Sequence, residues 1–230
     1  MSRKKLVVLT GAGISADSGL KTFRDSDGLW EGYPVHEVAT PEGWASNPAL
    51  VLEFYNQRRR QIAAALPNAA HRGLAALEQF FDVTIITQNI DDLHERGGSS
   101  KIIHLHGQIF QMRSEWDETI VYPVTGDISL GEKAPDGGQL RPHIVWFGEP
   151  VPMIEEAAKI TRQADILVVI GSSLVVYPAA GLLQFAAKRI PKFILDKNIP
   201  DTGLVHHLTA IEASAAEGIG ILKDKLMALG

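Results

Sequence analysis

The sequence predicts an α/β protein in which a doubly wound parallel sheet carries a small inserted module. Short apolar segments without polar alternation, as expected for strands buried on both faces of a sheet, recur at 6–9, 83–86, 102–105, 165–170 and 193–195. Helical patterns lie between or after them, at 48–66, 68–80, 152–163, 179–189 and 214–228. Strand–helix alternation of this kind is typical of open sheets covered by helices on both faces.

The composition narrows the class of protein. A chain of 230 residues, 45% hydrophobic and 21% charged, suits one large globular domain, or one with a small insertion. A net charge of −5 argues against nucleic acid or an anionic membrane as a partner. The sequence contains no cysteine, which excludes disulfides and thiolate metal sites.

The basic residues 3–5 precede an apolar run at 6–9 that is too short for a signal peptide, and no run approaches the length of a membrane span. We therefore expect a first buried strand there and a cytoplasmic protein.

Two stretches interrupt the strand–helix alternation. Residues 25–80 place helices and turns between the first and second strands, and residues 111–139 are rich in glycine, with a hairpin expected at 119–124. We expect both stretches to form one small module on one side of a cleft. Residues 1–24, 81–110 and 140–230 then form a Rossmann-like domain on the other side.

A glycine-rich turn follows the first predicted strand. Gly11-Ala12-Gly13-Ile14-Ser15-Ala16 matches the pattern G-x-G-x-x-G/A, whose glycines allow a tight turn and a close approach of pyrophosphate to a helix N-terminus. The acidic residue that usually follows about 20 positions later is missing, which disfavours a hydride-transferring dehydrogenase. An ordinary strand–helix turn is the alternative explanation.

Polar residues also follow the second predicted strand. Gln88, Asn89 and Asp91 could hold ribose hydroxyls or a carboxamide at the carboxyl edge of the sheet, where ligands of such folds bind. Alternatively, Asn89 and Asp91 simply cap the next helix.

Two histidines end the third predicted strand. His104 and His106 face the same side, but no third metal ligand accompanies them at a recognisable spacing. His106 is better interpreted as a general base, because the ordinary pKa of histidine lies near neutrality. After the strand at 165–170, Gly171-Ser172-Ser173 forms a second turn of small residues, suited to a phosphate or ribose or to an ordinary β–α turn.

Seven motifs in this order resemble those of the sirtuin family. They are Gly-Ala-Gly-Ile-Ser, Thr-Phe-Arg, Gly-Leu-Trp, Thr-Gln-Asn-Ile-Asp, His-Leu-His-Gly, Leu-Arg-Pro-His-Ile-Val-Trp-Phe-Gly-Glu and Gly-Ser-Ser. Each is weak alone, but the set is specific, and the resemblance spans residues 5–230. It implies NAD-dependent removal of acyl groups from protein lysines, with release of nicotinamide and O-acyl-ADP-ribose.

The resemblance also implies roles for single residues. His106 would be the catalytic base that takes a proton from the ribose hydroxyls, with Asn89 in the catalytic set. NAD would be bound by Gly11, Ala12, Gly13, Ser15, Asp17, Phe23, Arg24, Trp30, Gln88, Asn89, Ile90, Asp91, Gly171, Ser172, Ser173, Asp196 and Ala215. The acyl-lysine substrate would be bound by Tyr55, Arg58, Val145, Phe147 and Gly148, within a segment, 143–149, that borders a peptide groove.

Two features depart from the family pattern. Sirtuins usually hold a structural zinc with four cysteines in the segment equivalent to 111–139, which here contains neither cysteine nor histidine. We therefore expect no metal, and expect apolar packing instead from Trp116, Ile120, Val121 and Tyr122. The family's asparagine near the adenosine is also missing, and either Asp196 or Asn198 replaces it.

The helix expected from residue 48 carries a clue to the substrate. Asn47-Pro48 is a typical helix start, and Arg58 lies on the apolar stripe of that helix, with Tyr55 on a neighbouring face. Tyr55-x-x-Arg58 resembles the signature of sirtuins that prefer succinyl and malonyl lysine, in which the arginine binds the acyl carboxylate. A solvated run of Arg58-Arg59-Arg60 is the alternative.

These observations predict an NAD-dependent protein deacylase, a deacetylase and also a desuccinylase and demalonylase, that acts on acyl-lysine proteins and is a monomer. One alternative is a mono-ADP-ribosyltransferase, in which a protein nucleophile captures the ribosyl cation. Another is a non-catalytic module that binds NAD or ADP-ribose. The presence of His106, Asn89 and Asp91 argues against such a module, because binding alone needs no base.

Overall fold

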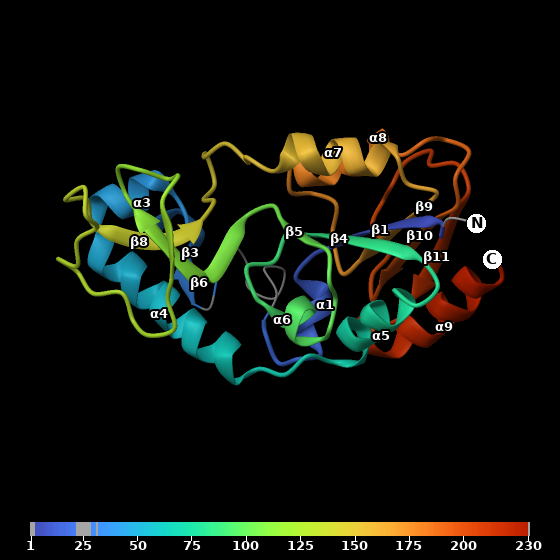
Figure 1. The fold of residues 1–230 in the computed structure, drawn as a ribbon, viewed down its shortest axis with the longest axis horizontal. Coiled ribbons are helices and arrows are strands. Elements are labelled where there is room, and N and C mark those ends of the chain that lie inside the picture. The colour runs from blue at the N-terminus through green and yellow to red at the C-terminus, as the bar shows by residue number, and fades with distance from the viewer. Residues whose placement is uncertain (1–2, 22–28, 31, 230) are drawn as a thin grey trace.

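A six-stranded parallel sheet forms the larger part of the computed structural model, which describes residues 3–21, 29–30 and 32–229 (Figure 1). The strand order is β11-β10-β9-β1-β4-β5, with bounds β1 (Lys5–Thr10), β4 (Asp82–Thr87), β5 (Ile102–His104), β9 (Ile166–Ile170), β10 (Lys192–Asp196) and β11 (Leu208–Glu212). From β1 the chain builds the sheet first toward β5 and later, from β9, toward β11. The order therefore reverses between β1 and β9, where open α/β sheets bind their ligands.

Helices cover both faces of this sheet, as the sequence predicts (Figure 1). Alternate side chains of β1 show why: Leu6 and Val8 pack with α5 (Ala69–Leu77) and α9 (Ala215–Met227), whereas Val7 and Leu9 pack with α7 (Ile154–Arg162) and α8 (Leu182–Phe185). All four side chains are buried. Because both faces are apolar, the strand shows no polar alternation.

A second region, at the opposite end of the molecule, holds the small module (Figure 1). It contains α2 (Val35–Val38), α3 (Pro41–Ser46), α4 (Pro48–Ala64), a strand pair β2 (Leu29–Trp30) and β3 (Tyr33–Pro34), and an antiparallel sheet of order β7-β6-β8. The bounds of that sheet are β6 (Gly107–Ser114), β7 (Val121–Pro123) and β8 (Leu140–Ile144). The boundary expected between 110 and 111 thus falls inside β6, which pairs with β8 from Gly107 onward.

Hydrogen bonds from α4 to backbone groups hold the loop after β7. Asn56 donates from Nδ2 to the Ile128 carbonyl and accepts at Oδ1 from the Ile128 amide, each at 3.0 Å. Arg59 donates from Nε to the Ile109 carbonyl at 2.9 Å and from Nη1 to the Gly126 carbonyl at 3.1 Å. Both polar side chains are buried, so each bond satisfies groups that have lost contact with water.

Gln139 closes the same loop from β8's side. Its Nε2 donates to the Ser129 and Leu140 carbonyls, both at 2.9 Å, and its Oε1 accepts from the Gly131 amide at 2.6 Å. In the segment for which the sirtuin resemblance implies a zinc site, side-chain hydrogen bonds therefore fix the backbone. No group of three or more potential metal-ligating side chains occurs among the described residues.

The expected apolar replacement for zinc is wrong for most of its members. The side chains of Trp116, Ile120 and Val121 are 68%, 49% and 37% exposed, and only Tyr122 packs against the module's core. The buried apolar residues of this segment in the module's core are instead Ile128 and Ala134.

Two elements of the larger domain also differ from expectation. The strand β11 was not predicted, and the helix expected at 179–189 forms only a 3-10 turn, η2 (Ala179–Gly181), and α8. The cause of the early end is Lys192, whose buried ammonium donates to the carbonyls of Ala187, Lys188 and Ile190 and so holds that segment in a non-helical turn. Within the described part of the chain, no helix has the length and apolar character needed to cross a membrane.

Candidate active site

A cavity of about 460 Å³ lies where the carboxyl edge of the parallel sheet meets the small module. The cavity brings together most of the predicted site residues, from both regions. They are Gly11, Ala12, Gly13, Ser15, Trp30, Tyr55, Arg58, Gln88, Asn89, Ile90, Asp91, His106, Val145, Phe147, Gly148, Gly171, Ser172, Ser173, Asp196 and Ala215.

One described residue of the predicted set, Asp17, is not part of this lining. Phe23 and Arg24 lie outside the described residues. Asp17 lies beside the cavity, where its carboxylate accepts from the Ala216 amide at 3.1 Å and pairs with Lys197 at 3.5 Å. Burial opposes ionisation of Asp17, but these partners outweigh it and lower its pKa. Its visible contacts therefore hold the start of α9.

The glycine-rich turn and the turn after β9 meet backbone to backbone. Gly11 donates to the Ile170 carbonyl at 3.0 Å and Gly13 to the Gly171 carbonyl at 2.9 Å. A Cβ atom on Gly13 would lie 2.6 Å from the Gly171 Cα, and one on Gly11 would lie 2.7 Å from the Gly171 oxygen. Gly171 itself has a φ of 63°. These glycines are thus required by the contact between the two loops, before any ligand is considered.

Buried polar groups line the cavity beside this turn. The Ser15 hydroxyl donates to Asp91 Oδ2 at 2.9 Å and accepts from Asn89 Nδ2 at 3.1 Å. Asp91 also accepts from the Leu93 amide at 3.2 Å, so it does cap α6 (Leu93–Arg96) in part. Burial raises the pKa of Asp91, although its hydrogen bonds oppose that shift. The network fixes the Asn89 amide at the wall of the cavity.

His106 has the protonation state that a base needs. Its Nδ1 lies 2.9 Å from the Gln88 carbonyl oxygen, which can only accept, so Nδ1 carries the proton and Nε2 has a free lone pair. Burial lowers the pKa of His106, while the bond to Gln88 partly opposes that shift. The imidazole is therefore neutral at pH 7 and able to accept a proton.

The adenosine side of the predicted site lies along β9 and β10. Gln88 donates from Nε2 to the Ser172 hydroxyl at 3.0 Å, which ties the loop after β4 to the loop after β9. Asp196 ends β10 and accepts from the Asn198 amide at 3.0 Å. Both Asp196 and Asn198 line the cavity, so either can replace the family's asparagine.

Tyr55 and Arg58, both on α4, line the cavity on the side that the small module forms. Tyr55 is fully buried, its hydroxyl accepts from Trp146 Nε1 at 3.0 Å, and burial raises its pKa, so the hydroxyl keeps its proton. Arg58 is 5% exposed, donates to Gln61 Oε1 at 3.1 Å and lies 5.5 Å from the centre of the Trp30 ring.

The alternative of a solvated arginine run is wrong. Arg58 and Arg59 are both buried and point to different places, the cavity and the loop after β7. Only Arg60 is on the surface, where it pairs with Glu53 and Asp127. Consecutive residues of a helix face different directions, so the three arginines lie at the cavity, against the loop after β7 and at the surface.

Several lining residues were not singled out from the sequence, among them Trp146, Tyr177 and Lys197. Trp146 lies in the segment expected to border the peptide groove, and an aromatic residue flanked by Val145 and Phe147 was the available signal. Tyr177 and Lys197 follow β9 and β10, and only their place after a strand end could have indicated them.

Known proteins resemble this chain over most of its length. Residues 11–178 match the model of the Sir2 family. NAD-dependent protein deacylases of Helicobacter pylori and Bacteroides thetaiotaomicron are 52% and 50% identical to this chain, with 97% of this chain and 98% of each relative covered.

Solved structures agree as well. A Sir2 homologue in complex with ADP-ribose superposes with a TM-score of 0.89 at 35% identity, covering 99% of this chain and 95% of that one. A Sir2 homologue in complex with NAD gives a TM-score of 0.88 at 35% identity, covering 99% and 91%. The resemblance seen in the sequence motifs is thereby confirmed: the chain belongs to the Sir2 family.

Proposed function

We propose that the chain, an NAD-dependent protein deacylase by its close similarity to such enzymes, favours acyl groups that end in a carboxylate, such as succinyl and malonyl. The observation that supports this preference is a buried arginine and a buried tyrosine, Arg58 and Tyr55, on the wall of the cavity that also contains His106.

The sheet side of the cavity would perform the reaction. NAD supplies a ribose carbon and nicotinamide as leaving group, and the glycine turns with Ser15, Asn89 and Asp91 would orient it. His106 would accept a proton from a ribose hydroxyl at Nε2, because Nδ1 is already committed to the Gln88 carbonyl. With nicotinamide released and one water consumed, the acyl group would pass to ADP-ribose and the free lysine amine would leave.

The module side would select the acyl group. A guanidinium that is 5% exposed sits in surroundings where water screens charge poorly, so a carboxylate in the cavity would be attracted more strongly than at a surface. An acetyl group has no charge to offer. Arg58 should therefore discriminate between acyl groups, whereas His106 should serve all of them.

A mass-spectrometric assay tests the proposal. One lysine peptide is prepared with acetyl and with succinyl groups, and each is incubated with and without NAD. We expect NAD-dependent loss of succinyl to be faster than loss of acetyl, with O-acyl-ADP-ribose released. ADP-ribose attached to protein, with no peptide deacylated, would favour the transferase alternative instead.

The variant Arg58→Met should lower kcat/KM for the succinyl peptide by about 10- to 100-fold, the loss expected for a hydrogen bond to a charged group, and change deacetylation far less. Arg60→Met is the matched control, since it removes an arginine of the same helix that pairs with Glu53 and Asp127 at the surface. Equal losses for both acyl groups in Arg58→Met would show that this arginine is structural.

A further inference from the structure

Tyr55, on the wall of the cavity, is itself oriented by the indole of Trp146. The Tyr55 hydroxyl lies 3.0 Å from Trp146 Nε1. An indole N–H can only donate, so the tyrosine oxygen accepts this bond and its own hydrogen must point elsewhere. Trp146 thus fixes the direction in which Tyr55 can donate.

The indole is held in turn from the side of the small sheet. The Arg141 guanidinium lies 3.3 Å from the centre of the Trp146 ring, in van der Waals contact with its face. Trp146 also packs against Tyr55, with ring centres 6.4 Å apart and planes inclined by 30°. The ring is therefore held by a cation from β8 over its face and by the phenol that it orients.

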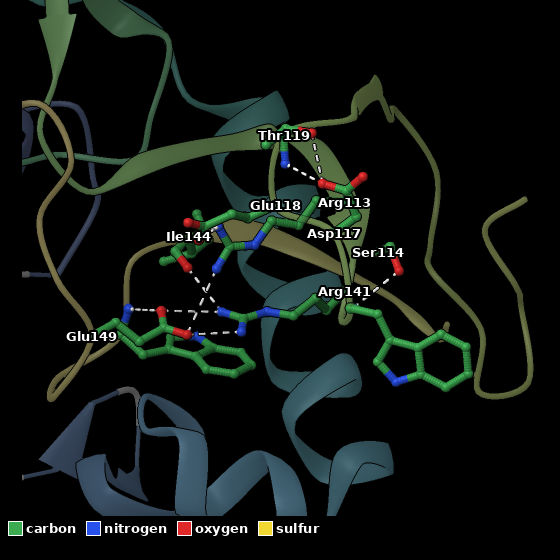
Figure 2. Close-up of polar contacts among 10 residues, drawn as sticks. Arg113, Ser114, Asp117, Glu118, Thr119, Arg141, Ile144 and Glu149 are labelled. Atoms are coloured by element: carbon green, nitrogen blue, oxygen red, sulfur yellow. Dashed lines mark hydrogen bonds and ion pairs between the residues drawn. The ribbon is translucent and has the colours of Figure 1, made fainter. Parts of the chain in front are cut away.

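A carboxylate completes the arrangement. Glu149 accepts from Arg141 Nη1 at 2.9 Å and Nη2 at 3.3 Å, and from the backbone amide of Trp146 at 2.8 Å. Arg113 of β6 lies 3.6 Å from the same carboxylate. Figure 2 shows Glu149 facing Arg113 and Arg141, with a further bond from Arg141 to the Ile144 carbonyl. One carboxylate therefore anchors both the backbone of the turn and the cation on the indole.

We infer that Trp146 is a positioning residue for acyl-group selection, acting through the Tyr55 hydroxyl, and that Arg141 and Glu149 hold it in place. This inference rests on the proposed preference for acyl groups that end in a carboxylate. Through Arg113 and Arg141, the antiparallel sheet β7-β6-β8 would then contribute to the choice of acyl group. A misdirected Tyr55 hydroxyl would weaken binding of an acyl carboxylate more than binding of an acetyl group.

The test is the variant Trp146→Phe, which keeps an aromatic ring and removes the N–H. We expect the ratio of kcat/KM for succinyl over acetyl peptide to fall by about 3- to 10-fold, the usual contribution of one hydrogen bond. Trp44→Phe is the matched control, because Trp44 packs against Trp146 but donates its own N–H to Glu115, at 3.2 Å. In that variant the ratio should not change.

A double-mutant cycle with Tyr55→Phe separates positioning from general loosening of the fold. If Trp146 acts through the Tyr55 hydroxyl, Trp146→Phe should cause no further fall of the ratio in the Tyr55→Phe background. Falls that add up in full would overturn the inference and leave Trp146 a structural residue.

A second variant covers the case in which Trp146→Phe folds poorly. Glu149→Gln retains the indole N–H but weakens its anchoring, and it should lower the same ratio less, again only when Tyr55 is present. If Tyr55→Phe lowers the ratio but neither Trp146→Phe nor Glu149→Gln does, the inference alone fails. If the wild-type protein shows no preference for succinyl and Tyr55→Phe changes nothing, the proposed specificity fails and the inference with it.

Discussion

The parallel-sheet domain and the small module hold their chains in place by different means. In the larger domain, apolar side chains of adjacent strands form two continuous cores, one on each face of the sheet. In the module, a third apolar core is supplemented by Asn56, Arg59 and Gln139, which bond backbone groups of the loop between β7 and β8. The comparison indicates that directional side-chain bonds can fix the segment for which the sirtuin resemblance implies a metal.

In the proposed function, the same division separates chemistry from selection. The sheet domain contributes His106 and Asn89, and the module contributes Tyr55 and Arg58. Changes in the first region should therefore affect every acyl substrate alike, and changes in the second should distinguish among them. The following predictions test these contrasts.

The largest effect is expected for His106→Ala. Loss of a general base typically costs 10²- to 10⁴-fold in rate, and we expect at least about 100-fold for acetyl and succinyl peptides alike. The melting temperature should stay close to that of the wild type, since His106 lines the cavity and is partly exposed there. Turnover that survives the substitution would exclude His106 as the base.

The sheet domain should also be the more sensitive region to acid. His71 and His94 are fully buried with ring centres 5.0 Å apart, and burial lowers the pKa of His71 to about 4 and that of His94 well below its ordinary value. The unfolded chain binds protons on these residues below pH ~6.5, while the folded chain resists them. Stability is therefore complete above pH ~6.5 and falls as the pH drops toward 4, by up to about 3 kcal/mol for His71.

Urea unfolding midpoints measured from pH 4 to 8 check this expectation. In His71→Gln the fall between pH 6.5 and 4 should be shallower, even if stability at pH 8 is lower. An unchanged slope in this variant would mean that acid acts elsewhere.

A smaller, local effect is expected for Asn56→Ala in the module. The substitution leaves the Ile128 amide and carbonyl without their partner, at a cost of about 1–3 kcal/mol. Amide hydrogen exchange should accelerate at 126–139 but not in the strands of the parallel sheet. The matched comparison is Leu74→Ala, a buried core position of α5. This substitution should lower the free energy of unfolding by about 2–5 kcal/mol and accelerate exchange in the parallel sheet. Uniform acceleration in Asn56→Ala would show that the two regions unfold together.

A strong chelator is expected to have no effect on the protein. Because the chain has no cysteine and the module's loop is held by side-chain hydrogen bonds, activity and melting temperature should not change. A clear fall in either would reveal a metal that supports the fold.

The sequence could predict those parts of the molecule in which each residue's own chemistry determines the local structure. The core strands follow from apolar runs such as 166–170, and α4 follows from the Asn47-Pro48 start, where Asn47 Oδ1 accepts from the Leu50 amide at 3.1 Å. The polar residues at strand ends likewise assemble one cavity, because parallel strands bring their carboxyl ends together.

What could not be predicted depends on partners distant in sequence. The early end of α8 needs the Lys192 ammonium, and the burial of Arg59 needs carbonyls 50 and 67 residues away. Similarly, the edge strand β11, Leu208–Glu212, has mixed exposure and shows no clear pattern of its own. In the module, an apolar residue could as well be buried as exposed, and Trp116 is exposed.

The contact of Gly11 and Gly13 with Gly171 has a consequence for how this protein can vary. Two loops about 160 positions apart in the chain touch chiefly through main-chain atoms, the Ser172 Cβ being the one side-chain atom among the nearest neighbours, so trimming a side chain on either loop makes little room for one on the other. A substitution in one loop therefore has no compensating partner in the opposite loop. The three glycines should therefore be kept together. A library that randomises both loops at once should return glycine at positions 11, 13 and 171 among the folded variants.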